Sequence, residues 1–505
     1  MTAVRGAGSV GSGLAPAREA RPVRDDERIH VVGVAGAGAS AAALLAFHRG
    51  AAVSGCDAGG PSPYTPPLEA AGIQLDWGHD PRHVSDGRPQ RLAVTKALTA
   101  IDPDNPELAA ARSAGVPVEP WQQLIADAAV GKTLVGVAGT HGKSTTAGWL
   151  VHVLVAAGLD PCAFVGALLP AALTGGLPST ARWGGGAPFV VEADEYAGNF
   201  DPYHPDIAIL TSAEWDHPDV FADRAAVIAS FEAWLRQAGH AGRRPTLVAN
   251  LGDSGAAAVA QHLRDWPGTI LGTELTVGAG APSGGGAWLA GTISAADATG
   301  TTLRIEGSGL AAPVIARLQL AGRHNAANAL GVVGAALMLG VSPDAVGAAL
   351  GSFRGVGRRL ERKGEGRGVV VYDDYGHHPT AIRETLAALR QLEPGRRIWA
   401  VYEPLTYHRT AAMLDEFADV LATADAVAIA DIWAGRDPDT TITSAAGLAE
   451  ATARRRPGLV SVAPGTVEQT ADWLAREVRA GDAVLVMGGG KSYRIADLLM
   501  EALGS

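Results

Sequence analysis

The sequence predicts an α/β protein built from three consecutive domains, and three observations support this. The chain has 505 residues, too many for one ordinary core and enough for about three domains of roughly 100–200 residues. Three successive blocks alternate short apolar runs with segments of helical periodicity. In the first two blocks a glycine-containing turn separates an apolar run from a helix, as in a parallel α/β unit.

The first domain is predicted over residues 29–130, after an extension formed by residues 1–28. The extension is rich in Gly, Ala and Arg and lacks the apolar segment of a signal peptide, so we expect it to be disordered. The domain opens with the apolar run 29–34, a glycine-rich turn and a helix near 40–48. A second apolar run, 51–56, completes a strand–turn–helix–strand unit.

The second domain is predicted over residues 131–321. Its apolar run 133–137 leads through a loop into a helix at 143–156, and later strands are expected near 190 and 208. Between 269 and 315, short β-like pieces alternate with Gly, Ser and Pro turns, which predicts a small antiparallel flap on the domain edge.

The third domain is predicted over residues 322–505. A helix near 325–339 is expected to open it. Alternating strands and helices follow, with the strands expected at 368–372, 398–402, 426–430 and 483–487.

Composition excludes several classes of function. The formal charge of −11 argues against a general nucleic-acid binder, which needs a basic face. No apolar stretch reaches the roughly 18–20 residues of a membrane span, so we expect a cytoplasmic protein without a membrane partner. Cys56 and Cys162 lie far apart, without a Cys-x-x-Cys or histidine spacing, and are expected to be reduced, buried residues with no disulfide or metal role.

The segment GVAGTHGKST at residues 136–145 predicts a phosphate-binding loop. Gly139 and Gly142 would let backbone N–H groups turn toward an anion at the start of the next helix. Lys143 would neutralise phosphate oxygens and the Ser144 hydroxyl would bind Mg²⁺. Val137 stands where the common pattern has its first glycine, so the match is imperfect. The alternative is a glycine-rich helix start without a ligand.

Acidic residues follow two apolar runs of the same domain. Glu192 and Glu195 end one run, and Glu214-Trp-Asp-His217 follows the next. The carboxyl ends of parallel strands gather ligands, so these side chains suit a second Mg²⁺ or the positioning of a nucleophile. The alternative is that they are solvated loop residues or helix caps.

A glycine-rich turn at residues 33–38 follows the first apolar run, and Asp57 follows the second as a possible ribose partner. From the residues alone, an NAD site, a UDP-sugar site and a tight structural turn remain open.

Three polar motifs lie in the third block: GRHNAAN from residue 322, GRR from 357 and DDYGHHP from 373. Asn and His side chains at a domain junction could bind a base edge, Arg359 could clamp a phosphate, and Asp374 could accept from a ribose or an ammonium group. Local helix capping is the alternative. His377 and His378 are adjacent and would diverge, so they make a poor metal pair.

With these motifs in order, the chain resembles the Mur ligase family over nearly its full length after residue 28. The matching motifs are HVVG from residue 30, VSGCD from 53, DPDNPE from 102, GTHGKS from 139, EADE from 192, DH at 216, GRHN from 322, GRR from 357 and DDYGHHP from 373.

The resemblance implies an N-terminal Rossmann-like domain for a UDP-linked substrate, a central P-loop ATPase-type domain with a small antiparallel flap, and a C-terminal Rossmann-like domain. It also implies an ATP-dependent amide ligase that works through an acyl phosphate with ATP and two Mg²⁺. Residues 218–236 contain no lysine, which is typical of the alanine-adding branch, where L-alanine is joined to UDP-N-acetylmuramate for peptidoglycan synthesis. The implied partners are small molecules, and a monomer or homodimer is expected.

The resemblance also assigns residues by position. The catalytic set is Lys143, Glu192, His217 and Arg359, and the Mg²⁺ ligands are Ser144, Glu192 and His217. The ATP-binding set is Gly139, Thr140, His141, Gly142, Lys143, Ser144, Thr145, His324, Asn325, Asn328, Arg359 and Asp374. The substrate-binding set is Gly36, Ala37, Gly38, Asp57, Glu195, His378 and Arg409.

The chain departs from the family on the substrate side. The family has Ser-Asp where Tyr196-Ala197 follow the EADE motif, a histidine at the Leu405 position, and another sequence in place of the segment around Lys96. Tyr196 is similar to the residue of the murein-tripeptide recycling ligase. Two alternatives therefore stay open: a Mur-like ligase that uses another acid or amine, and a nucleotide-binding paralogue without ligase activity.

Overall fold

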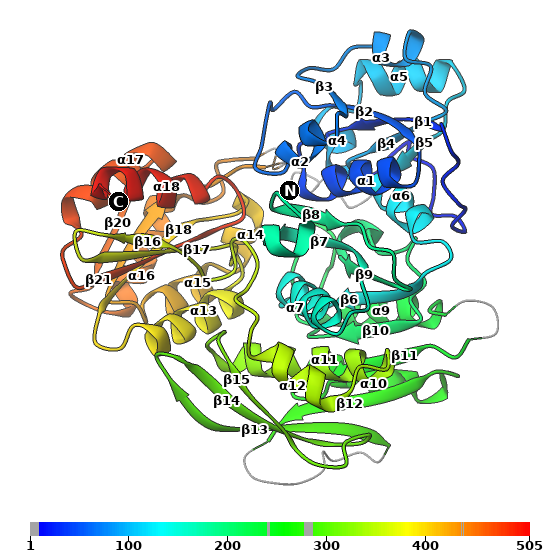
Figure 1. The fold of residues 1–505 in the computed structure, drawn as a ribbon. Helices are drawn as coiled ribbons and strands as arrows, with labels where there is room; N and C mark the ends of the chain where they lie inside the picture. Colours follow the sequence, from blue (N-terminus) through cyan, green and yellow to red (C-terminus); the bar gives the residue numbers. More distant parts are fainter. Residues whose placement is uncertain (1–9, 240–242, 277–285, 436, 438, 505) are drawn as a thin grey trace.

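The computed structural model describes residues 10–504 except 240–242, 277–285, 436 and 438. Figure 1 shows three α/β domains in chain order, with the N-terminal domain in blue, the central domain in cyan and green, and the C-terminal domain in yellow to red. The three-domain α/β fold predicted from the sequence is confirmed. None of the helices in the described residues is both long and apolar enough to cross a membrane.

The first domain is a five-stranded parallel sheet in the order β3-β2-β1-β4-β5. Its strands are β1 Arg28–Val32, β2 Ala52–Cys56, β3 Gln74–Asp76, β4 Arg91–Val94 and β5 Val118–Pro120. Its helices are α1 Ala37–His48, α2 Pro66–Ala70, α3 Arg82–Ser85, α4 Lys96–Ile101, α5 Pro106–Ser113 and α6 Trp121–Ala128. The apolar strands form a core on each face of the sheet, as a parallel sheet requires.

The segment before β1 is a correction to the sequence prediction. Arg18 forms ion pairs with Glu119 at 2.7 Å and with Asp127 at 2.8 Å, and Arg21 pairs with Glu27 at 2.6 Å. All three carboxylates are nearly buried and need cationic partners, so the described part of the extension is tied to the first domain. Residues 1–9 lie outside the described residues.

The central domain is a ten-stranded sheet in the order β15-β14-β13-β12-β11-β10-β6-β9-β7-β8. Its strands are β6 Thr133–Ala138, β7 Cys162–Leu169, β8 Ser179–Arg182, β9 Pro188–Ala193, β10 Ile207–Leu210, β11 Thr246–Asn250, β12 Thr269–Leu275, β13 Ala287–Asp297, β14 Gly300–Gly307 and β15 Val314–Leu318. Its helices before β13 are α7 Lys143–Ala156, α8 Ala171–Thr174, α9 Arg224–Arg236 and α10 Ser254–His262, with 3₁₀ turns η2 Tyr196–Gly198 and η3 Leu263–Asp265.

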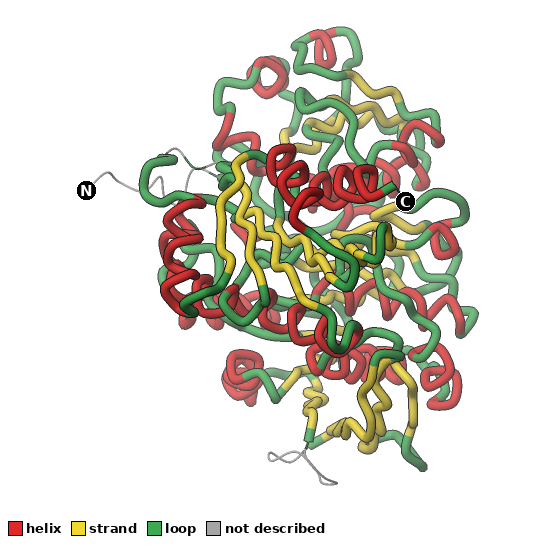
Figure 2. The backbone as a smooth tube through the Cα atoms, turned by 90° about the vertical axis from the view of Figure 1, so that its left-hand side faces the viewer, coloured by secondary structure: helices red, strands yellow, loops and turns green. Residues whose placement is uncertain are grey.

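The antiparallel flap is formed by β13, β14 and β15, and it projects at the bottom of the molecule in Figures 1 and 2. The prediction of a flap is confirmed, but β12 is parallel to both β11 and β13 and therefore extends the main sheet instead.

Two helices cross the predicted boundary at residue 322. Helices α11 Arg323–Met338 and α12 Pro343–Leu350 pack against α7 and the central sheet, where their apolar side chains join the core around Val248 and Leu303. The sequence placed α11 in the third domain, and this is corrected: apolar burial attaches both helices to the central domain, and the next sheet begins only at Glu361.

The third domain is a six-stranded sheet in the order β16-β17-β21-β18-β19-β20, parallel except for β16. Its strands are β16 Glu361–Gly366, β17 Val369–Asp374, β18 Arg397–Glu403, β19 Ala426–Ala430, β20 Val460–Gly465 and β21 Asp482–Gly488. Its helices are α13 Pro379–Leu392, α14 Tyr407–Ala412, α15 Leu414–Leu421, α16 Ala445–Arg455, α17 Val467–Glu477 and α18 Tyr493–Leu503. Two apolar cores cover the two faces of this sheet.

Candidate active site

The predicted phosphate loop lies between β6 and α7, where three strands end side by side. In the sheet register Ala138 of β6 pairs with Ala193 of β9 and with Leu210 of β10. Residues that follow these three strands therefore meet at one sheet edge, which is where ligands of parallel α/β sheets gather. This brings together the acidic motifs that the sequence placed about 50 and 70 residues beyond the loop.

Two glycines give the loop its shape. Gly139 has φ +135° and Gly142 has φ +81°, in the region that side chains rarely adopt. A Cβ at Gly139 would lie 2.1 Å from Thr211 Oγ1, and one at Gly142 would lie 2.7 Å from Asn328 Oδ1. The loop is thus a close backbone cradle at the N-terminus of a 14-residue helix, the setting in which N–H groups bind phosphate.

Lys143 lies between acidic residues of the same site. Its Nζ donates to Gly139 O at 2.7 Å and pairs with Glu195 at 2.9 Å and Asp194 at 3.5 Å. Burial opposes the charged form, but Glu195 and Asp194 outweigh it and raise the pKa of Lys143 above its usual value. Lys143 therefore carries a permanent charge next to the loop.

Ser144 joins two domains through its hydroxyl group. Ser144 Oγ donates to Glu192 Oε1 at 3.0 Å and accepts from Arg359 Nη2 of the third domain at 2.8 Å. The other oxygen of Glu192 accepts from the Gly166 N–H at 2.6 Å. A hydroxyl and a carboxylate oxygen in contact are hard oxygen ligands of the kind that Mg²⁺ binds.

His217 does not have the partner that the sequence suggested. Its imidazole lies close to the carboxylates of Asp194 and Glu195, and the possible ligand atoms of these three residues all lie within 4.8 Å of one another. Glu192 does not belong to this group. Asp194 was missed as a site residue, although it lies inside the EADE motif. The turn after β9 folds Asp194 and Glu195 toward His217, whereas Glu192, still within the strand, faces Ser144.

Arg409 reaches the same region from the third domain. Its guanidinium pairs with Asp216 Oδ1 at 2.8 Å and donates to His217 Nδ1 at 3.1 Å. Asp216 and Arg409 are each 4% exposed, so this is a buried ion pair across the domain junction. Arg409 thereby orients His217, whose φ of +56° is unusual for a non-glycine residue.

A second cluster contains His141 of the loop, Glu214 and His378. His141 Nε2 lies 3.0 Å from Glu214 Oε2, and the two imidazole rings lie 4.6 Å apart. Burial and the neighbouring His141 lower the pKa of His378 to about 4, so its imidazole is neutral at physiological pH. His378 also accepts from the Thr380 N–H at the start of α13, as the capping alternative expected.

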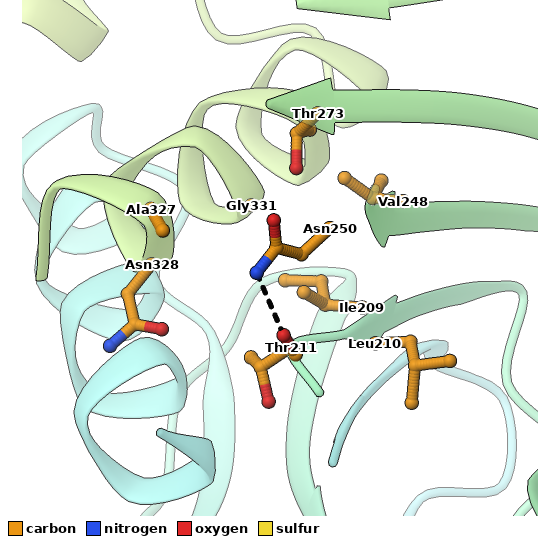
Figure 3. A pocket seen from close by; sticks show the side chains of 9 residues that line it. All are labelled: Ile209, Leu210, Thr211, Val248, Asn250, Thr273, Ala327, Asn328 and Gly331. Carbon is orange, nitrogen blue, oxygen red and sulfur yellow. Dashed lines mark hydrogen bonds between the residues drawn. The ribbon is translucent and has the colours of Figure 1, made fainter. Parts of the chain in front are cut away.

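The predicted base-binding residues fall into two groups. Asn328 contacts the phosphate loop at Gly142 and lines a small pocket between α11 and the ends of β10, β11 and β12, shown in Figure 3. The other two residues have partners of their own: Asn325 Nδ2 donates to Ala321 O at 2.7 Å, and His324 lies 3.4 Å from Glu384. Their contact with a base remains a prediction.

Asp374 organises the loop that carries Arg359. Its two oxygens accept from the N–H groups of Leu360 at 2.7 Å and Gly376 at 2.6 Å. Burial raises the pKa of Asp374. Arg359 also lies over the Tyr375 ring, 4.7 Å from its centre. The observed role of Asp374 is to hold backbone, and its predicted contact with a ligand remains untested.

The glycine turn of the first domain is closed by Asp57. Its carboxylate accepts from the N–H groups of Ala35 at 3.1 Å and Gly59 at 2.8 Å. Gly36 precedes α1, which begins at Ala37, and a Cβ at Gly38 would lie 2.2 Å from the Trp121 ring. Both oxygens of Asp57 therefore hold the backbone of the turn, which argues against the prediction that Asp57 is free to bind a ribose.

Three of the departures from the family lie together at the junction of the first and central domains. Lys96 Nζ donates to Ala197 O at 2.8 Å, and Ala197 has φ +48°. The Tyr196 ring lies 4.8 Å from the His217 ring, and its hydroxyl donates to Asp219 at 3.0 Å. Leu405 lies elsewhere, in the third domain, where it forms an isolated bridge with Trp433.

Sequence profiles of known families match all three domains. The profile described as "Mur ligase family, catalytic domain" matches residues 28–133, "Mur ligase middle domain" matches 137–336, and "Mur ligase, glutamate ligase domain" matches 358–490. The chain belongs to the Mur ligase family. The middle-domain match includes most of α11, in agreement with the packing of that helix.

Relatives of this Mur ligase align with it over nearly their whole length. A UDP-N-acetylmuramate–L-alanine ligase of Roseiflexus castenholzii is 36% identical over 94% of this chain and 97% of its own. The enzyme of the same name from Kineococcus radiotolerans is 39% identical over 94% of this chain and 96% of its own.

Two solved structures share the fold. The UDP-N-acetylmuramate-alanine ligase of Thermotoga maritima has a TM-score of 0.73 at 24% identity and covers 94% of this chain and 98% of that one. A murein peptide ligase of Psychrobacter arcticus has a TM-score of 0.69 at 25% identity, with the same coverage.

As a Mur ligase, the protein is an ATP-dependent enzyme that forms a carbon–nitrogen bond, and the family generally uses Mg²⁺. The residues present fit both ligands. The glycine cradle and Lys143 suit phosphates, and the Ser144 and Glu192 oxygens suit a hard divalent cation.

Proposed function

We propose that this Mur ligase joins L-alanine to UDP-N-acetylmuramate in the synthesis of the peptidoglycan precursor. The observation that carries the proposal is the match, over 94% of this chain, to full-length relatives that bear this activity in their names. The intact phosphate loop with Lys143, Ser144 and Glu192 supports catalysis over a non-catalytic paralogue.

The site residues suit a two-step reaction. In the first step a substrate carboxylate oxygen attacks the γ-phosphorus of ATP, and ADP leaves. In the second step the amine of the amino acid attacks the acyl-phosphate carbon, inorganic phosphate leaves, and the amine gives up a proton. Both steps place negative charge on phosphate oxygens, where Lys143 and Arg359 offer fixed positive charge.

We assign the metal ligands by their contacts. Ser144 and Glu192 would hold one Mg²⁺, and Asp194, Glu195 and His217 a second, so two ions are part of the proposal. When bound, the ions neutralise phosphate charge. Counting the Mn²⁺ ions that bind per chain only when a non-hydrolysable ATP analogue is present tests this. A single ion per chain would contradict it.

We extend the proposal to the remaining properties of the protein. Its substrates are small molecules, and it acts in the cytoplasm as a monomer or homodimer, which cell fractionation and size-exclusion chromatography test. We place the domain boundaries near residues 130 and 355, which limited proteolysis followed by mass spectrometry tests.

One observation favours a second candidate function. Tyr196, Ala197 and Lys96, which depart from the expected family pattern, lie at the junction between the first and central domains, and Tyr196 is similar to the residue expected in the murein-tripeptide recycling ligase. A solved protein of that group, from Neisseria meningitides, is named a UDP-N-acetylmuramate:L-alanyl-γ-D-glutamyl-meso-diaminopimelate ligase. Both candidates use the same acid, so they differ only in the amine.

The decisive experiment measures phosphate release by the purified chain with ATP, Mg²⁺ and UDP-N-acetylmuramate. The amines are L-alanine, glycine, L-serine and the tripeptide L-alanyl-γ-D-glutamyl-meso-diaminopimelate. We expect release that depends on both the UDP-sugar and L-alanine. Release with the tripeptide alone would favour the second candidate, and no dependence on UDP-N-acetylmuramate would contradict both.

A matched pair of lysine variants tests the ATP site. Lys143→Ala removes the only ammonium group observed at the phosphate loop of the described structure, so we expect phosphate release to fall by at least about 10²-fold with any substrate pair. Lys132→Ala removes a lysine of the same domain whose Nζ donates to Gly186 O at 2.6 Å, and we expect near wild-type turnover. Retained activity in Lys143→Ala would mean that the ATP site is assigned wrongly.

A further inference from the structure

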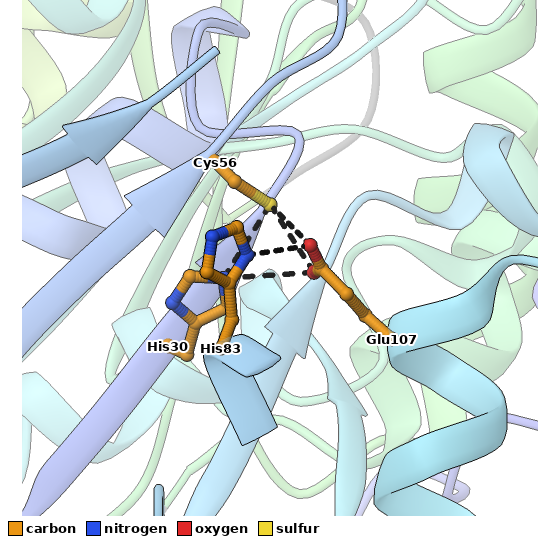
Figure 4. A group of neighbouring side chains, drawn as sticks. All are labelled: His30, Cys56, His83 and Glu107. Carbon is orange, nitrogen blue, oxygen red and sulfur yellow. Dashed lines mark hydrogen bonds and ion pairs between the residues drawn. The ribbon is translucent and has the colours of Figure 1, made fainter. Parts of the chain in front are cut away.

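A cluster of metal-ligand side chains lies in the first domain, apart from the phosphate loop. His30, Cys56, His83 and Glu107 each offer one ligand atom, and these atoms all lie within 4.8 Å of one another. The four residues come from four elements, namely β1, the end of β2, α3 and α5. Figure 4 shows the Cys56 sulfur and the two imidazole rings facing the Glu107 carboxylate.

The distances among His30, Cys56 and Glu107 are close to those of a tetrahedral zinc site, and the ligand atom of His83 lies within 4.8 Å of the other three. Cys56 Sγ lies 3.4 Å from His30 Nε2 and 3.2 Å from both Glu107 oxygens, and His30 Nε2 lies 3.5 Å from Glu107 Oε2. Ligands at zinc-bond lengths in a tetrahedron are about 3.3–3.6 Å apart. His83 Nδ1 lies 2.7 Å from Glu107 Oε1 and would move away by about 0.6 Å.

Each histidine also has a partner on the side that faces away from the cluster. The Ser54 hydroxyl lies 2.8 Å from His30 Nδ1, and when it accepts that N–H the lone pair of Nε2 points at Cys56 and Glu107. Asp76 Oδ2 lies 3.6 Å from His83 Nε2, an ion-pair distance, and would have to approach by about 0.6 Å to accept its N–H and fix its tautomer. Metal-binding histidines usually have such outer partners, which set the tautomer and the ring orientation.

Charge is balanced when a divalent ion is bound. His30 is 2% exposed, and Cys56 and Glu107 are fully buried. In the described part of the chain only histidines form ion pairs with Glu107, so no lysine or arginine neutralises it. A thiolate, a carboxylate and two neutral imidazoles carry two negative charges in total, which one M²⁺ ion cancels, whereas an unpaired buried charge is costly.

We propose that His30, Cys56, His83 and Glu107 form a structural site for a divalent transition metal, with zinc as the best fit. Sulfur and nitrogen ligands select zinc over Mg²⁺, and four protein ligands leave no open position for substrate. The ion would tie β1 and β2 to α3 and α5. His83 is 17% exposed at its side chain and marks the entry path. This proposal is independent of the ligase reaction.

His79 lies beside the site without belonging to it. Its Nδ1 is 3.4 Å from Cys56 Sγ and 3.7 Å from Glu107 Oε1, a position from which it can hydrogen-bond a metal-bound thiolate.

The first test uses the unmodified full-length chain, freed of metal by a chelator and titrated with Co²⁺ in the absence of nucleotide. A thiolate ligand gives an intense sulfur-to-cobalt charge-transfer absorption, which the Asp194–Glu195–His217 group cannot produce because it has no sulfur. We expect this absorption to saturate near one Co²⁺ per chain and to disappear when Zn²⁺ is added. Its absence would overturn the proposal and leave a hydrogen-bonded cluster only.

The second test compares the two buried cysteines. We expect the chain purified without chelators to retain about one zinc, and Cys56→Ser to lose it along with the cobalt absorption. Cys162→Ser should keep both, because Cys162 donates to Gly184 O and lies outside the cluster. Equal zinc content in the two variants would contradict the proposal.

Two milder variants test the proposal even if Cys56→Ser does not fold. Ser54→Ala and Asp76→Asn leave all four ligands in place and remove one outer partner each, so we expect zinc affinity to fall by about 10–100-fold while the cobalt absorption persists. Wild-type affinity in both variants would mean that the imidazoles are not ligands.

Discussion

At the residue scale, neutralisation of charge determines where the site side chains lie. Lys143 sits between Asp194 and Glu195, and Arg409 sits against Asp216. Glu195, Asp216 and Arg409 are buried, which makes their ion pairs costly to separate, so Glu195 and Asp216 fix the positions of Lys143 and Arg409. The cations are thus held in place before substrate arrives, and fixed charge is what transition-state stabilisation needs.

Glu403 is a residue whose charge the fold suppresses. It ends β18, is 3% exposed, and its Oε2 has no hydrogen-bond partner in the described structure. Burial, only partly offset by the N–H groups of Ser492 and Lys491 and the charge of Arg358, raises its pKa from 4.5 to about 7. The folded chain therefore holds a proton on Glu403 that the unfolded chain releases above pH 4.5.

Glu403→Gln should make stability less dependent on pH. The native state binds more protons at Glu403 than the unfolded state, so this group lowers the free energy of unfolding as pH rises from 4.5 to about 7, by about 3 kcal/mol in total. The amide that Glu403→Gln introduces does not ionise, so this variant should not lose this stability as pH rises. Chemical denaturation at about pH 5 and about pH 8 measures the difference. The exposed Glu450→Gln should match wild type at both values, and equal slopes for all three chains would contradict the prediction.

At the element scale, the phosphate loop shows how a local sequence fixes a local shape. Strand β6, the loop and α7 are contiguous in sequence, and two glycines permit the turn between them. The loop still depends on other elements, because Thr211 after β10 and Asn328 of α11 pack directly against its glycines.

The variants Gly142→Ala and Gly158→Ala distinguish the effect of backbone strain, which both share, from the effect on the shape of the phosphate loop, which only Gly142→Ala has. Both glycines have positive φ, at +81° and +77°, so each alanine should lower stability by about 1–2 kcal/mol. Only at Gly142 does the new Cβ meet a neighbour, Asn328 at 2.7 Å, whereas Gly158 has open space. We expect ATP affinity to fall at least about tenfold for Gly142→Ala alone. Calorimetric titration with ATP would contradict this if both variants bind equally.

The segment before β1 supplies a second prediction at this scale. Arg18→Ala leaves the buried Asp127 and Glu119 with Arg91 as their remaining cation, so the first domain should lose about 1–2 kcal/mol of stability, limited because Arg18 is 30% exposed. Arg24→Ala removes a 64% exposed arginine 3.9 Å from Glu27 and should change stability by less than about 0.5 kcal/mol. Thermal unfolding compares the two, and equal midpoints would mean that the segment contributes nothing.

At the scale of the whole molecule, the site is assembled from different domains. The central domain supplies the loop and the acidic strand ends, while the third domain supplies Arg359, His378 and Arg409. The first domain contributes Lys96, bonded to Ala197 of the central domain. The residues proposed to act in catalysis therefore come together only where the domains meet.

Arg359→Ala tests that dependence. It removes the contact with Ser144 at 2.8 Å and a positive charge proposed to act on the phosphoryl group, so we expect kcat to fall by about 10²-fold or more. Arg362→Ala, a 49% exposed arginine on β16 paired with Glu365, should leave kcat unchanged. Steady-state kinetics measures kcat for both variants, and thermal unfolding confirms that both are folded. A wild-type kcat for Arg359→Ala would contradict the assignment.

The sequence by itself determined the α/β fold, the phosphate loop and the acidic strand ends, because strands, glycine turns and helix starts are encoded by neighbouring residues. It failed at residues 10–27 and at α11, since ion pairing and apolar burial with distant partners decided their place. Only the tertiary structure paired His217 with Asp194 and Glu195, Ser144 with Arg359, and Cys56 with His30, His83 and Glu107. Strand order and domain docking set those contacts, and neither is visible in the spacing of residues along the chain.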